Sequence, residues 1–138
     1  MKRLFQSFGH GFRGIGATFK SEPNFRIHCF SAVLAVIFGF VYKISMIEWI
    51  AVIFAIGIVL AAEAMNTGLE ALADAVHPEE HRLVGKAKDA AASAVLITSI
   101  AAATVGGIVF APKIFLPLWN WLSQMIESLN HPPGFTNL

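Results

Sequence analysis

This chain of 138 residues has the composition of a membrane protein rather than that of a soluble domain. Apolar residues make up 56% and charged residues only 14%, whereas soluble domains carry about 25% charged residues. The net charge of +1 gives no reason to expect a nucleic-acid partner, and the single cysteine, Cys29, excludes an internal disulfide framework and a cysteine zinc cluster. One domain is expected at this length.

The first segment, residues 1–20, is predicted to be an amphipathic helix in the membrane interface. Its apolar side chains recur at helical spacing between basic and small residues, a pattern typical of helices that lie on membranes. The alternative is a frayed tail, because four glycines weaken the helix. The segment lacks the apolar block of a cleavable signal peptide, so we expect it to be retained. The apolar positions are Leu4, Phe5, Phe8, Phe12, Ile15 and Phe19.

Three apolar segments are each long enough to cross a bilayer as a helix that rises about 1.5 Å per residue. The first runs from about residue 25 to 42, after a break in which Pro23 suits the first turn of the next helix. The second runs from about 46 to 76 and ends before a proline, because the residue preceding proline disfavours the helical region. The third runs from about 89 to 110, and its alanines and glycines suit close helix packing.

Residues 112–138 are expected to form a separate C-terminal segment. Residues 114–129 are apolar and contain two tryptophans, which favours an interfacial helix, and a loose tail is expected from residue 131. Eight basic residues lie before the first span, at its start, or between the second and third spans, and only Lys43 and Lys113 lie on the other side. By the positive-inside rule we expect a cytoplasmic N-terminus and an outside C-terminus.

Polar residues share one face at the end of the second span. Glu63, Asn66, Glu70 and Asp74 sit at i, i+3, i+7 and i+11, which places them within an arc of roughly 80° on a helix. Charged groups beside a membrane are costly, and like charges repel one another unless a cation or a proton compensates them. Magnesium is the simplest compensator, because it takes carboxylate oxygens and is shared with substrate phosphates.

Residues from the other two spans could join this face on the cytoplasmic side. Glu22 opens the first span and Lys88–Asp89 opens the third, so carboxylates, an amide and lysines would meet there. These groups suit a magnesium–nucleotide complex and transfer of its phosphoryl group. The chain has no Walker-type glycine-rich loop and no protein-kinase signature, so generic motifs alone do not establish nucleotide binding. An ordinary solvated helix end is the alternative, and it suits Glu63 and Asn66 poorly because of their depth.

Two motifs in this region belong together. The first is Glu-x-x-Asn-Thr-x-Leu-Glu-x-x-x-Asp at residues 63–74, and the second is Ala-Lys-Asp at residues 87–89. Together they resemble the prokaryotic diacylglycerol kinase family, which includes the undecaprenol kinases. The resemblance covers about residues 1–111 and includes the order of the amphipathic helix and the three spans.

The resemblance implies an all-α, homotrimeric integral membrane kinase of the bacterial cytoplasmic membrane. It implies that ATP and Mg²⁺ are used to phosphorylate a lipid alcohol at the cytoplasmic interface. Glu63 is then the general base that takes the proton from the lipid hydroxyl, and Glu22 and Glu70 are the magnesium ligands. The stretch from Asn24 to His28 resembles the undecaprenol kinases more than the diacylglycerol-specific branch. The residues expected to contact the nucleotide complex are Arg3, Glu22, Asn66, Glu70, Glu79, Glu80, His81, Lys88 and Asp89.

Two other classes of protein stay open from the residues themselves. A transporter or channel could use membrane carboxylates to carry ions, although the acids cluster at one end and no inverted repeat is apparent. A structural membrane subunit could use the polar face to bind partner helices. Replacing Glu63 with glutamine separates these classes, because a kinase should lose phosphoryl transfer while still assembling.

Overall fold

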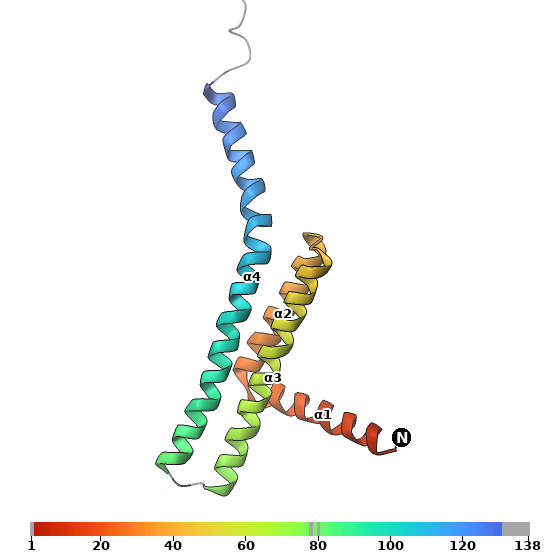
Figure 1. Ribbon diagram of the computed structural model, residues 1–138, viewed down its shortest axis with the longest axis vertical. Coiled ribbons are helices and arrows are strands. Elements are labelled where there is room, and N and C mark those ends of the chain that lie inside the picture. The colour runs from red at the N-terminus through yellow and green to blue at the C-terminus, as the bar shows by residue number, and fades with distance from the viewer. Residues whose placement is uncertain (1, 78, 80, 131–138) are drawn as a thin grey trace, which may run out of the picture.

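The computed structural model describes residues 2–77, 79 and 81–130, and these residues contain four α-helices and no strand. The helices are α1 (Lys2–Ser21), α2 (Pro23–Val41), α3 (Met46–Val76) and α4 (Arg82–Asn130). Figure 1 shows α2, α3 and α4 running alongside one another, whereas α1 leaves them at a steep angle. The last three helices are each long and apolar enough to cross a membrane, which confirms an all-helical chain with three candidate spans.

The ends of the first three helices are set by local sequence signals. Glu22 has an extended backbone that separates α1 from α2, and Pro23 follows in the first turn of α2, where a missing N–H is tolerated. α3 begins with a capping box in which Ser45 Oγ accepts from the Glu48 N–H at 3.3 Å. The Ser45 N–H in turn donates to the Glu48 carboxylate at 2.6 Å. These signals produce an antiparallel hairpin of α2 and α3.

The hairpin brings the start of α2 level with the middle of α3. α2 has 19 residues, so it rises about 28 Å between Pro23 and the turn. An equal rise of about 28 Å along α3, counted from Met46, ends near residue 64. Glu22 and Glu63 are therefore expected at the same depth, although 41 positions separate them in the chain.

A small core joins the three long helices beside the α2–α3 turn. Its buried members are Ile44, Val52, Val109 and Phe110. Trp49 packs against α2 nearby, and its Cη2 atom lies 2.6 Å from the position that a Cβ on Gly39 would take. Glycine therefore permits the close approach of α2 and α3. Most other large apolar side chains are exposed on the single chain, as expected for helices that face lipid or other helices.

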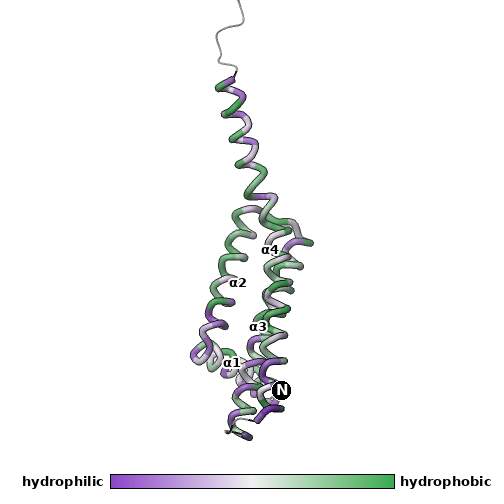
Figure 2. Tube along the Cα trace, turned by 90° about the vertical axis from the view of Figure 1, so that its left-hand side faces the viewer, coloured by the Kyte–Doolittle hydropathy of each residue, from purple (hydrophilic) through white to green (hydrophobic). Residues whose placement is uncertain are grey.

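Polar and apolar residues are segregated along the molecule. Figure 2 shows hydrophobic residues along the middle of α2, α3 and α4. Hydrophilic residues gather where α3 ends and α4 begins, at the same end as α1. This end is the one at which the sequence predicts the functional site.

α4 is longer than the predicted third span. The helix begins at Arg82 rather than near residue 89, and it continues through Pro112 and Pro117 to Asn130. A proline removes one backbone hydrogen bond and commonly kinks a helix instead of ending it, so residues 112–130 continue α4 without a break. Figure 1 shows α4 bending in this region and continuing away from the other helices. The predicted tail from residue 131 lies outside the described residues.

Candidate active site

Glu63 is a deeply buried acid in the middle of α3. It follows the apolar stretch of that helix and is only 3% exposed. The carboxylate lies close enough to Glu22, His28 and Glu70 for their charges to act on it. Burying an acid beside two further acids is costly unless a proton, a cation or a polar substrate compensates the charge. The position of Glu63 is therefore better explained by chemistry than by stability.

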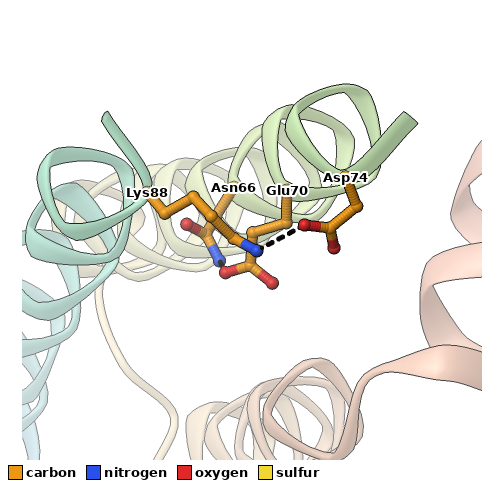
Figure 3. A network of polar contacts seen from close by, with 4 residues as sticks. All are labelled: Asn66, Glu70, Asp74 and Lys88. Carbon is orange, nitrogen blue, oxygen red and sulfur yellow. Dashed lines mark hydrogen bonds and ion pairs between the residues drawn. The ribbon is translucent and has the colours of Figure 1, made fainter. Parts of the chain in front are cut away.

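Asn66 and Glu70 form a hydrogen-bonded pair on the same side of α3. Asn66 Nδ2 donates to Glu70 Oε1 at 2.8 Å, which fixes the orientation of both side chains. The other amide atom, Asn66 Oδ1, is buried and has no hydrogen-bond partner. A buried amide oxygen without a partner can accept a hydrogen bond from a ligand or bind a cation. Figure 3 shows Asn66, Glu70 and Asp74 projecting from α3 to one side.

Lys88 brings a positive charge from α4 to this acidic face. Its Nζ atom lies 2.8 Å from Asp74 Oδ1 (Figure 3). The side chain of Lys88 is 33% exposed and that of Asp74 is 68% exposed. A solvated pair of this kind contributes little to stability, because water and salt screen the two charges. Lys88 can therefore exchange Asp74 for another anion at little cost.

A groove of about 530 Å³ lies beside this pair, at the turn between α3 and α4. Glu79 and His81 line it together with Asp74 and Lys88. The ring centroid of His77 lies 5.0 Å from that of His81. The groove therefore presents carboxylates, imidazoles and cationic groups at the end of α3 that follows the acidic face, a mixture that suits a polar, phosphorylated ligand.

The structure brings together only part of the predicted nucleotide site. Arg3 in α1 and Asp89 in α4 are both exposed, and neither is among the described residues that line the groove. Glu80 lies outside the described residues. The predicted site residues near the acidic face or in the groove are Glu22, Glu63, Asn66, Glu70, Glu79, His81 and Lys88.

The oxygen atoms at this end suit magnesium, although the acids do not form a closed cage. Within the part of the chain that the structure describes, no three His, Cys, Asp or Glu side chains are grouped to hold a metal ion. Magnesium usually takes one or two carboxylates and completes its shell with waters and substrate phosphates. Glu70, nearby Glu22 and the unpartnered Asn66 Oδ1 could supply such a partial set.

Three residues near this site were not predicted from the sequence to belong to it. His28 has no histidine partner at metal-ligand spacing, yet the antiparallel packing of α2 on α3 places it near Glu63. His77 and Arg82 line the groove, but no sequence motif distinguishes them from ordinary loop residues. Only the three-dimensional arrangement identifies them.

The fold and the site together define a small helical membrane protein with an acidic, polar centre at one end of its spans. Residues 9–110 match the family model of the prokaryotic diacylglycerol kinases. The chain belongs to this family and is a lipid kinase. The transporter and structural-subunit alternatives are therefore not retained. The match ends at residue 110, so the last part of α4 lies beyond it.

Individual relatives agree with the family match. The chain is 37% identical over 114 residues to the undecaprenol kinase of Bacillus subtilis, an alignment that covers 83% of this chain and 93% of that protein. It is 32% identical over 111 residues to the diacylglycerol kinase of Haemophilus influenzae, covering 80% and 94%. It is 31% identical over 100 residues to the diacylglycerol kinase of Escherichia coli K12, covering 72% and 82%. The names of these relatives refer to two different lipid alcohols.

Proposed function

We propose that this kinase transfers the γ-phosphoryl group of ATP, with Mg²⁺, to the hydroxyl of a membrane lipid alcohol at the cytoplasmic surface. The observation that carries the proposal is the burial of Glu63 within range of the charges of Glu22 and Glu70, on the helix whose C-terminal end lines a polar groove. A lipid can present its hydroxyl at this depth while its chains stay in the bilayer. The nucleotide can approach from water by way of the groove at the end of the same helix.

In this proposal Glu63 acts as the general base. Its carboxylate accepts the proton of the lipid hydroxyl, and the lipid oxygen forms a bond to the γ-phosphorus. The bond between the γ-phosphorus and the oxygen that bridges it to the β-phosphorus breaks, and ADP leaves. Burial strengthens the hydrogen bond between base and hydroxyl, because no bulk water competes for the carboxylate.

Glu22 and Glu70 are the proposed magnesium ligands, and Asn66 holds Glu70 in place. The ion would supply neutralisation of the charge on the transferred phosphoryl group. Lys88 is proposed to contact the phosphates after releasing Asp74. The remaining proposed nucleotide contacts, which rest on the family pattern and in part on the groove, are Arg3, Glu79, Glu80, His81 and Asp89.

Undecaprenol is the lipid alcohol that we propose as the preferred substrate. The stretch from Asn24 to His28 is similar to the undecaprenol kinase branch. His28 also lies near the proposed base, so this stretch is placed where it could contact the acceptor lipid. Diacylglycerol is the alternative acceptor of the same chemistry.

The arrangement in the membrane is also a proposal. We infer that α1 lies on the cytoplasmic surface, because large apolar side chains such as Phe5 (74% exposed) and Phe12 (72% exposed) have no cover in the single chain. We infer a homotrimer from the family resemblance, and the exposed apolar surface of the spans leaves room for contacts between copies. The kinase unit is taken as residues 1–111, in the bacterial cytoplasmic membrane with the N-terminus inside and the C-terminus outside.

The proposal is tested with purified protein, radiolabelled ATP and Mg²⁺, offered undecaprenol and diacylglycerol in separate micelles. Glu63→Gln should lower the rate by about 10²–10⁴-fold, the usual contribution of a general base. Glu127→Gln is the control, because it removes an exposed acid that lies beyond the family match. Product from neither lipid, or full activity of Glu63→Gln, would contradict the proposal.

A further inference from the structure

The end of α4 leaves the rest of the protein. Lys113 Nζ lies 3.0 Å from Glu48 Oε1, at the start of α3, and this ion pair marks the level at which α4 passes the α2–α3 turn. Every residue from Ile114 to Asn130 is exposed in the single chain. This segment of 17 residues is about 25 Å long and lies beyond the family match. Its surface therefore has to be covered by something other than the described part of its own chain.

The exposed apolar residues follow the pattern of a helix that packs on other helices. Their successive spacings are three, four, three and four residues, which is the a and d pattern of a heptad repeat. The members of this stripe, named here the α4 stripe, are Phe115, Leu118, Leu122, Met125 and Leu129. From residue 120 onward polar residues occupy the opposite side, and Glu127 stands at an f position, away from the stripe. Packing along the stripe would therefore bury no charge.

Two observations favour copies of this chain over a lipid surface as the cover. Helices that lie on membranes usually carry Lys and Arg on their polar face, whereas the only charged residue from 114 to 130 is Glu127. A spanning helix must also turn sharply to lie in the membrane plane. α4 bends but stays helical through Pro112 and Pro117 and continues away from the bundle (Figure 1).

The area of the α4 stripe is compatible with association between copies. Trp119 and Ile126 flank it, seven residues apart, and are 69% and 58% exposed. An aromatic side chain can bury about 150–250 Å², and a stable interface needs about 800 Å² per partner. Two aromatic and five aliphatic side chains on one face bring the segment near that size. Copies that cross the membrane in the same direction also hold residues 114–130 parallel to one another and at the same height.

We propose that residues 114–130 pair with the same segment of other copies of this chain, forming a short parallel helical bundle outside the bilayer. The bundle lies on the side opposite the acidic site. It holds the kinase copies together through contacts that residues 9–110 do not supply. This interface goes beyond the proposed catalytic function and does not depend on it.

Disulfide cross-linking in native membranes tests the proposal with the full chain. In a Cys29→Ala background, Leu122→Cys and Met125→Cys place single thiols on the α4 stripe. Ser123→Cys and Glu127→Cys are the matched controls on the outer face of the same helix. Oxidation should yield covalent dimers several-fold faster at the two stripe positions than at the two controls. Retained lipid kinase activity shows that each variant is folded.

Two results would overturn the proposal. Equal rates at all four positions would indicate random collision, and no dimer at either stripe position would exclude a bundle. In the second case, quenching of tryptophan fluorescence by brominated lipids is measured in a Trp49→Phe variant, which leaves Trp119 and Trp121 as the only tryptophans. Strong quenching would then assign the stripe to the membrane surface, and no quenching would assign it to a different partner.

Discussion

Glu63 and Lys88 show two different uses of charge within one short stretch of structure. Glu63 is buried with other acids nearby, so its charge opposes folding unless it is compensated. Lys88 is partly exposed and already paired with Asp74, so its positive charge adds little free-energy cost to folding. Burial suits a group that exchanges a proton with a lipid, and exposure suits a group that has to capture an anion from water.

Removing the charge of Lys88 should weaken nucleotide binding without unfolding the protein. Lys88→Gln is expected to raise the KM for magnesium–ATP by about tenfold or more, because hydrogen bonds to charged groups contribute about 1.5–3 kcal/mol. The surface pair with Asp74 contributes little to stability, so the melting temperature should change little. Steady-state kinetics in micelles and thermal unfolding measure the two effects.

Lys86→Gln provides the control for this change, because Lys86 is an exposed lysine of the same helix that is not among the described lining residues of the groove. Its KM should match that of the unmodified protein. An unchanged KM in Lys88→Gln would remove Lys88 from the proposed nucleotide site.

At the scale of the elements, the α2–α3 hairpin determines where the site forms. Its turn is fixed by the Ser45–Glu48 capping box, and its helices are held close by Trp49 against Gly39. The resulting antiparallel register places Glu22 and His28 near Glu63. Packing at one end of the hairpin therefore sets the alignment of charged groups at the other end.

Adding a single methyl group at Gly39 should disturb this hairpin. In Gly39→Ala the new Cβ would stand 2.6 Å from Trp49 Cη2, so the ring or the helix must move. Overpacking of this kind costs about 1–3 kcal/mol, and the melting temperature in detergent should fall. Gly57→Ala is the matched control, because nothing lies within 4 Å of its Cβ position. Equal stability of the two variants would show that the hairpin tolerates a wider spacing.

The helices themselves were largely predictable from sequence, and the exception is informative. Apolar length and local stop signals act within a few residues, so the three spans and the turn after Tyr42 follow from the chain directly. The continuation of α4 did not follow, because Pro112 and Pro117 can either end or kink a helix. The Lys113–Glu48 ion pair joins α4 to α3 at this point. Because its two partners belong to different helices, this contact cannot be read from the sequence around the prolines.

At the scale of the whole molecule, charge asymmetry predicts how the protein sits in the membrane. The N-terminal region and the α3–α4 turn hold eight of the ten basic residues. These regions lie at the same end of the structure (Figure 2), so one side of the bilayer would receive both.

A cysteine-labelling experiment checks this orientation. In a Cys29→Ala background, a membrane-impermeant maleimide should label Lys43→Cys in intact spheroplasts. Lys86→Cys should be labelled only after the membrane is broken, because it lies at the basic end, which the positive-inside rule predicts to be cytoplasmic. The reverse pattern would place the acidic site outside, where cytoplasmic ATP could not reach it.

The sequence by itself determined the three apolar spans, the acidic face of residues 63–74 and the family to which the chain belongs. Each of these depends on local spacing along one helix, which the order of residues records directly. Only the tertiary structure decided that Glu63 is buried near Glu22 and His28, that Lys88 pairs with Asp74, and that α4 projects beyond its neighbours. These features depend on which helix faces meet, and contacts between distant segments are not recorded in any local pattern.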